Sequence, residues 1–197
     1  MKKTPQHFRR EKVKTLFNKI LKENKTVLTP ASISCYESLD DDFTTTDFSF
    51  EEKGNVSRIV NLTDIKGKGF IDGVFKGLYE YYVADYTSIE KIKLVDIMVN
   101  PIMKASKKLG SEAKASVLFR IEVDNHGLAE FHHESRSMIY SCFVSALEAF
   151  QFYINCERTF QRIKFIIDDA TIRNRGDILQ LCLNDLSKLT EVNTYER

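Results

Sequence analysis

The stretch from Gly67 to Leu78, which reads GKGFIDGVFKGL, is the feature that most constrains the fold. Two glycines close a predicted strand, and apolar residues then recur with helical spacing. Because glycine tolerates positive φ and the close approach of another backbone, Gly67 and Gly69 predict a tight strand-to-helix turn. The backbone N–H groups that open such a helix have no partner within it, so they can hold a carboxylate. Two interpretations of the turn stay open, a purely structural one and a carboxylate-binding one.

Strand patterns precede this turn. Residues 43–52 alternate, with Phe48 and Phe50 on one face, which predicts a half-buried strand. The turn signal at 53–55 follows, and 56–65 then predicts a returning strand. A helix is expected over about 71–83, directly after the glycines.

The second half repeats this order. An apolar run at 92–99 predicts a strand that is buried on both faces. Alternation over 113–123, the turn at 124–127 and the segment 128–134 predict a hairpin. Two units of about three strands and one helix each follow from this order. The expected class is α+β, two βββα-like units whose antiparallel sheets carry helices on one face.

The two ends of the chain differ from this middle part. Residues 1–25 carry nine Lys or Arg and two Glu, and their apolar positions predict an amphipathic helix. We expect residues 1–42 to be a helical, linker-like and mobile segment outside the sheet core. Residues 43–156 form the expected α+β domain, and 157–197 a C-terminal helical extension with one more amphipathic helix after Gly176.

The segment 138–154 is apolar around most of its helical circumference. One explanation is a homodimer built around this helix and the neighbouring sheet, because monomers seldom expose large apolar patches. The other is that the C-terminal helix folds back and caps the same face.

Composition excludes several classes of function. The net charge of +1 gives no broad field for nucleic acid or for a membrane surface, and no run approaches the length of a membrane span. The four cysteines have no metal-binding spacing and are expected to be buried free thiols in the cytoplasm. His132 and His133 are adjacent in a predicted strand, so they point to opposite faces, and we expect neither a metal site nor a cofactor. The hydroxyls of Ser135 and Ser137 are candidate caps for the next helix.

Four boxes, in order and at sensible spacing, resemble one family. Gly67–Gly73 resembles the G-x-G-P-[LIV]-D-A box in the C-terminal regulatory domain of 2-isopropylmalate and citramalate synthases. The segment 94–100 resembles its L-[LV]-D-Y-x-[IV]-N strand, 110–115 its G-[TS]-[DE]-A-x-[AG] box, and 137–153 its closing helix. The resemblance covers about residues 45–155, and residues 8–42 resemble a remnant of the family's linker subdomain.

The resemblance implies a regulatory domain without its catalytic part. A synthase of this family uses a (β/α)₈ barrel and a metal held by a His-x-His pair, but only 66 residues precede Gly67 and no His-x-His occurs. We therefore expect no enzymatic activity from this chain on its own. Matched by position, a pocket for leucine or a similar amino acid at a dimer interface involves these residues: Gly69, Ile71, Asp72, Leu94, Ile97, Ala113 and Ala115. Phe70, Ile97 and Pro101 depart from the family's usual Pro, Tyr and Ala, and Phe70 and Pro101 are expected to fill or reshape that pocket.

Three functions stay open. The first is an allosteric module that binds a branched-chain amino acid and acts on a separately encoded synthase. The second is a dimerising scaffold that has lost the ligand. The third is a non-catalytic subunit of a split synthase.

Overall fold

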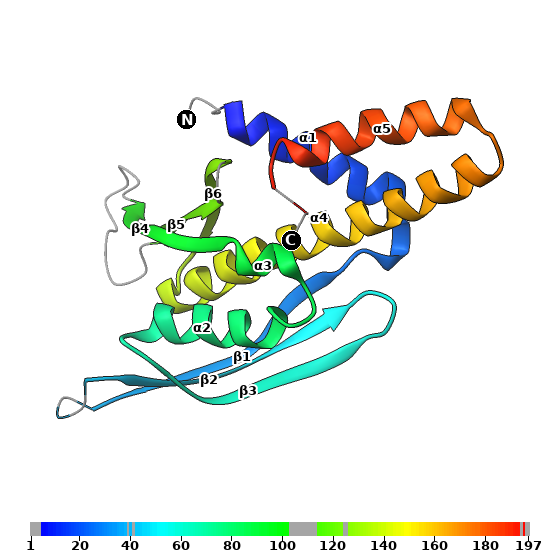
Figure 1. The fold of residues 1–197 in the computed structure, drawn as a ribbon. Coiled ribbons are helices and arrows are strands. Elements are labelled where there is room, and N and C mark those ends of the chain that lie inside the picture. The colour runs from blue at the N-terminus through cyan, green and yellow to red at the C-terminus, as the bar shows by residue number, and fades with distance from the viewer. Residues whose placement is uncertain are drawn as a thin grey trace.

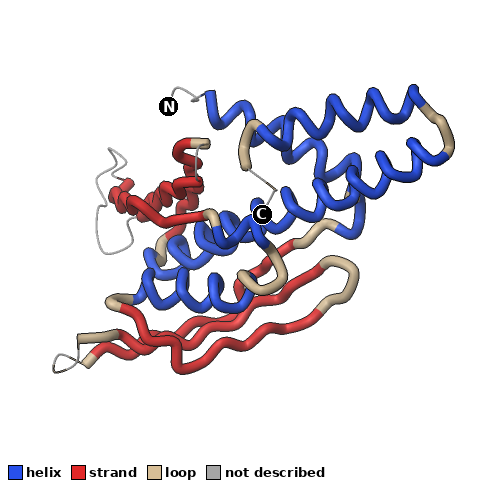
Figure 2. Tube along the Cα trace, viewed as in Figure 1, coloured by secondary structure: helices blue, strands red, loops and turns tan. Residues whose placement is uncertain are grey.

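Three strands followed by a helix occur twice along the chain, and this order decides the architecture. The computed structural model describes residues 5–38, 40, 42–102, 114–123, 126–193 and 195. The first block consists of α1 (Pro5–Ile20), the 3-10 turn η1 (Lys22–Asn24), β1 (Val27–Glu37), β2 (Thr44–Lys53), β3 (Arg58–Gly67) and α2 (Phe70–Tyr82). The second consists of α3 (Thr87–Glu90), β4 (Ile92–Ile102), β5 (Lys114–Val123), β6 (Gly127–Ser135), α4 (Met138–Ile172) and α5 (Gly176–Thr190). The predicted α+β class is confirmed, with two three-stranded antiparallel sheets (Figures 1 and 2).

The first sheet, which we call sheet A, pairs β1, β2 and β3 in sequence order. Phe48 and Phe50 of β2 are buried, and they lie opposite Leu62 and Val60 of β3. Successive side chains of a strand point to opposite faces, so the alternation read from the sequence places these phenylalanines against the core. α2 packs on β2 and β3 over this face. The predicted helix at 71–83 is confirmed.

The second sheet, sheet B, pairs β4, β5 and β6 in the same way. The inward side chains of β5 are buried, as their alternation predicts: Val117, Phe119, Ile121 and Val123. β5 and β6 form the predicted hairpin, and Gly127 at its end has φ 78°, a conformation that favours glycine. Asp124 and Asn125 of the turn lie outside the described residues.

The prediction that β4 is buried on both faces is wrong. β4 is an edge strand of sheet B, and Val95, Met98 and Val99 are exposed. An apolar run is the signature of a strand covered on both sides, but only the tertiary structure decides whether a strand lies at the centre or at the edge of a sheet.

α4 lies between the two sheets, and this explains its apolar circumference. It contacts β1 and α2 on one side and β5 and β6 on the other (Figure 1). Aromatic pairs mark the contacts, with ring centroids 5.3 Å apart for Phe143 and Phe48, 5.1 Å for Phe150 and Phe75, and 6.0 Å for Phe152 and Phe131. A single chain therefore buries the surface from which the sequence argued for a dimer. The homodimer itself stays a prediction, and it needs a different surface.

The expectation that residues 1–42 lie outside the sheet core is wrong. Residues 27–37 form β1, one of the two edge strands of sheet A, and Val13, Leu16 and Phe17 of α1 are buried in the core. The sequence did not indicate this strand because it contains Pro30, and proline argues against a central strand. Proline is tolerated at an edge or a bulge, which is where β1 places it. The pairing of β1 with β2 shifts register between Pro30 and Ser32.

The expected boundary at residue 156 does not hold either, because α4 continues without interruption to Ile172. α5 folds back along the second half of α4, with Cys182 and Leu189 buried, as the predicted amphipathic helix requires (Figure 1). The basic helix α1 also meets α5, where Lys19 lies 2.5 Å from Asp185. The described ion pairs that α1 makes with other segments join Lys19 to Asp185 of α5 and Arg9 to Glu191, the residue that follows α5.

Asp185 supports a prediction about stability and pH. Its carboxylate is 6% exposed and accepts hydrogen bonds from Lys19 at 2.5 Å and Lys188 at 2.9 Å. Burial acts to raise the pKa of this carboxyl, but the two ammonium groups outweigh it and hold the pKa below its usual value. Asp185→Asn is therefore expected to lower the free energy of unfolding at neutral pH by about 1–3 kcal/mol.

A carboxyl whose pKa is depressed by folding stabilises the protein above its unfolded pKa, and this contribution is lost as the pH falls through the folded pKa. The difference in the free energy of unfolding between wild type and Asp185→Asn should thus become smaller below about pH 4. Urea unfolding of both proteins at neutral and acidic pH measures it, with the exposed Asp168→Asn as the control. A difference that stays constant across this pH range would contradict the assignment.

Candidate functional site

Three glycines of the stretch Gly67–Leu78 let α2 lie close to β2 and to the end of β3. A Cβ atom added to Gly67 would lie 2.4 Å from the backbone nitrogen of Gly73. A Cβ on Gly73 would meet the Thr46 hydroxyl at 2.8 Å, and one on Gly77 would meet the Phe48 ring at 2.9 Å. Gly73 and Gly77 lie one turn apart, so they present a flat helix face to β2. These three glycines have a structural role, whatever else the turn does.

Gly69 differs from the other three glycines. A Cβ added there would meet nothing within 4 Å, and the start of α2 at Gly69 has no side-chain cap. The Asp72 carboxylate accepts a hydrogen bond from the Lys68 N–H at 2.8 Å, just ahead of the helix. The helix start is thus open, with backbone N–H groups beside a carboxylate. Such a pair suits the two charges of an amino acid, a carboxylate on the N–H groups and an ammonium on Asp72.

The other predicted pocket residues belong to sheet B. Leu94 pairs with Ile121, whereas Ala115 pairs with Pro101 near the opposite end of β5. Six residues of β5 separate these positions, which is about 20 Å along the strand at 3.3 Å per residue. Leu94 and Ile97 are partly buried against the core. One chain does not bring Leu94 and Ala115 together around a four-carbon side chain, and Ala113 lies outside the described residues.

His132 and His133 point to opposite faces of sheet B, as predicted. His132 lies on the outer face, where its Nε2 is 2.6 Å from the Ser116 hydroxyl and 3.4 Å from Glu134. Both partners meet the same ring nitrogen, so the three groups do not form the relay of a catalytic triad, which uses both nitrogens. His133 faces α4 and lies 3.3 Å from the Ser141 hydroxyl.

The serine caps predicted before α4 are confirmed. The Ser137 hydroxyl accepts a hydrogen bond from the Tyr140 N–H at 3.2 Å. The Ser135 hydroxyl lies 2.8 Å from that of Ser141 and donates to the Ser137 carbonyl at 2.6 Å. The start of α4 is therefore closed by its own side chains, whereas the start of α2 is open.

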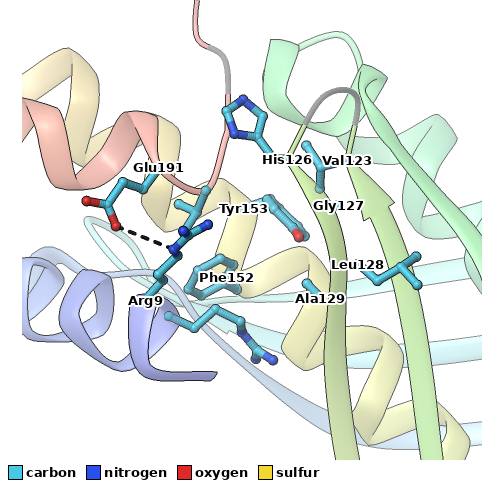
Figure 3. A pocket seen from close by; sticks show the side chains of 11 residues that line it. Arg9, Val123, His126, Gly127, Leu128, Ala129, Phe152, Tyr153 and Glu191 are labelled. Atoms are coloured by element: carbon cyan, nitrogen blue, oxygen red, sulfur yellow. Dashed lines mark ion pairs between the residues drawn. The ribbon is translucent and has the colours of Figure 1, made fainter. Parts of the chain in front are cut away.

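A small pocket lies where α1 meets the β5–β6 hairpin and the C-terminal segment (Figure 3). Arg10 forms part of its wall, with its guanidinium carbon 3.8 Å from the Phe131 ring centroid and 5.1 Å from that of Phe152. Arg10 also donates to the Glu130 carbonyl, and burial lowers the pKa of its guanidinium. Arg9 lies 3.8 Å from Glu191 across the opening.

The volume of this pocket is about 20 Å³, which holds about one water molecule and no amino acid. We interpret it as the seam where α1 docks on sheet B. Arg10 was not singled out from the sequence, although it stands three residues before Val13 and seven before Phe17, on the same helix face. A charged residue is expected at the surface, so the sequence did not indicate that Arg10 is partly buried.

The cysteines are free, as expected, but only three of them are buried. Cys142, Cys156 and Cys182 are buried, and burial raises the pKa of Cys142 to about 11, which keeps this thiol protonated and unreactive. Cys35 is exposed on β1, so the prediction of burial is wrong for this residue. Within the described ranges, no three His, Cys, Asp or Glu side chains gather as a metal site would require. No described helix has the length and apolar character of a membrane span.

Comparison with known proteins adds no assignment, since neither a protein-family model nor a curated protein sequence matches the chain.

Proposed function

We propose that this chain is a regulatory-type module that binds a small apolar amino acid at the start of α2. The supporting observation is the pair of βββα units, which is the fold implied by the resemblance to the regulatory domain of 2-isopropylmalate synthases. The resemblance further suggests a protein that acts on a separate synthase rather than one that catalyses condensation itself. The free cysteines support a cytoplasmic location.

The start of α2 offers chemistry for such a ligand. Its N–H groups carry the positive end of the helix dipole, which favours a carboxylate. Asp72 stands beside them and suits the ammonium group, while Phe70 and Ile71 supply partly buried apolar surface. Gly69 leaves the approach open.

We place this site at a homodimer interface. One chain does not gather the sheet B residues around α2, so a partner has to supply the remaining wall. Exposed apolar side chains for such a contact occur on β4 and on the first turn of α4: Val95, Met98, Val99, Met138, Ile139 and Tyr140. Twofold pairing is the commonest way to cover such surfaces.

The competing function is a scaffold without a ligand. The glycine contacts and the Asp72–Lys68 hydrogen bond explain the glycine spacing of the turn by packing and local hydrogen bonding, without a ligand. A protein that dimerises but binds no amino acid would fit this second candidate.

Leucine, isoleucine or valine is expected to raise the melting temperature of the purified protein. A ligand at a hundred times its Kd stabilises the folded state by about 2.7 kcal/mol. Thermal unfolding, followed by circular dichroism with each of the twenty amino acids, measures this, and light scattering measures the oligomeric state. Asp72→Asn should abolish the shift, whereas Asp85→Asn, an exposed carboxylate just beyond the other end of α2, should not. Absence of a shift with every amino acid would rule out this site and favour the scaffold.

A further inference from the structure

Two hollows meet on the side of the molecule where η1, the β2–β3 turn and the second half of α4 come together. The larger has a volume of about 900 Å³ and runs between the end of α1 with η1 and α4. The smaller has a volume of about 370 Å³ and lies between the β2–β3 turn and Tyr86. Asn55 and Arg158 line both hollows, so the two form one continuous groove.

The groove carries positive charge that the described carboxylates do not neutralise. Of its cations, Lys19 pairs with Asp185 and Arg58 pairs with Glu52 at 2.9 Å. Lys22, Arg158 and Arg162 also line the groove, and none of them forms an ion pair with a described carboxylate. Among the described residues that line the two hollows, the carboxylates are Glu23 in the larger and Glu52 in the smaller, so the cations outnumber them and the groove has a net positive charge.

Arg158 is fixed at the junction by neutral partners. Its guanidinium donates to the Thr26 hydroxyl and, at 3.1 Å, to the Asn55 side-chain oxygen. It also lies against the β2–β3 turn, since a Cβ added to Gly54 would be 3.2 Å from Arg158 Nη1. Neutral acceptors hold the group in place without cancelling its charge, so a bound anion gains a preorganised guanidinium. Arginine in this arrangement suits the planar, bidentate recognition of phosphate.

An exposed aromatic ring lies in the same groove. Phe165 is 62% exposed, and the Arg162 guanidinium carbon is 5.2 Å from its ring centroid. An exposed phenylalanine beside arginines provides a stacking surface for a flat heterocycle, as in sites that bind nucleobases. Ile166 adds apolar wall next to it.

We propose that this groove binds a nucleoside phosphate, with the phosphates on Arg158, Arg162 and Lys22 and the base stacked on Phe165. The site does not depend on the amino acid site proposed above. It lies beside the first residue of β3, whereas α2 begins beyond the last, so the length of β3, about 30 Å at 3.3 Å per residue, separates them. Loss of one site is therefore not expected to remove the other.

Isothermal titration calorimetry with ADP tests the proposal, with pyrophosphate and adenosine as partial ligands. Arg162→Gln and Arg158→Gln should each weaken ADP binding about tenfold, the cost of one charge-assisted hydrogen bond. Phe165→Ser should lower the affinity for ADP and leave the affinity for pyrophosphate unchanged. Lys164→Gln is the matched control, because it removes one charge from the same helix but on the wall of a different groove.

Arg162 and Phe165 are exposed, so their variants keep the test valid if Arg158→Gln fails to fold, which circular dichroism would reveal. No binding of millimolar ADP to the wild-type protein would overturn the proposal. An equal loss of ADP affinity in Lys164→Gln would also overturn the proposal, since binding would then depend on the overall positive charge and not on this groove. Pyrophosphate affinity equal to that of ADP, with no effect of Phe165→Ser, would overturn the nucleoside part.

Discussion

Replacing Gly67 by alanine is expected to lower the free energy of unfolding by about 3 kcal/mol or more, the upper range for overpacking a closed site. The new methyl group would lie 2.4 Å from the Gly73 backbone nitrogen and 2.8 Å from its Cα. Backbone atoms in a helix cannot turn aside as a flexible side chain can, so α2 itself has to move away from β3. That shift would open the contacts of Gly73 and Gly77 with β2.

Urea unfolding of Gly67→Ala and Gly69→Ala gives the measurement and its control. The two glycines stand two residues apart in the same turn, but a Cβ on Gly69 would meet nothing within 4 Å. Gly69→Ala is therefore expected to cost less than about 1 kcal/mol, the loss associated with a poorer helix cap. Equal destabilisation by both variants would show that conformational freedom, and not close packing, accounts for the glycines.

Replacing Asn155 by leucine is expected to cost about 2–4 kcal/mol. The buried Asn155 side chain accepts a hydrogen bond from the Thr26 N–H at 2.8 Å and donates one to the Thr26 carbonyl at 2.7 Å. Without it, two backbone groups at a residue that is 1% exposed lose their partner, and each such loss costs about 1–3 kcal/mol. Leucine has the same number of side-chain heavy atoms as asparagine and the same branch point, so no cavity contributes to the difference.

Guanidinium unfolding measures this effect, with the exposed Asn184→Leu on α5 as the control. Hydrogen exchange gives a second readout, since the Thr26 and Leu28 amides, which donate to Asn155 and Gln151, should lose protection before those of β2. Unchanged protection of both amides in Asn155→Leu would contradict the proposed role of Asn155 in fastening β1 to α4.

The elements with regular alternation could be predicted from the sequence. The phenylalanines at 48 and 50 face α2, and every second residue of β5 from Val117 is buried, because a period of two residues admits only one inward face. The α2 stripe and the serine cap of α4 follow from equally local rules. Local chemistry decides these features within a few residues of where they occur.

The features that depend on distant residues were missed. β1 contains a proline and a register shift, and it is recognisable as a strand only once β2 is available to pair with it and Asn155 and Gln151 hold its entry. The candidate sites depend on the same kind of information. Arg158 lies beside Asn55 only because α4 passes the β2–β3 turn, and no spacing in the sequence indicates this contact.

The sequence by itself determined that this chain makes two antiparallel sheets with amphipathic helices, because the spacing of apolar residues over a short stretch distinguishes a strand from a helix. It also determined that α4 had to be covered on more than one side. Only the tertiary structure decided what covers it. Two sheets, α1 and α2 of the same chain compete with any partner for that apolar surface, and they already bury Phe143, Phe150 and Phe152. A periodic apolar pattern shows which side chains of a helix have to be buried. It does not show which segment buries them, because burial depends on every apolar surface that the folded chain brings against the helix.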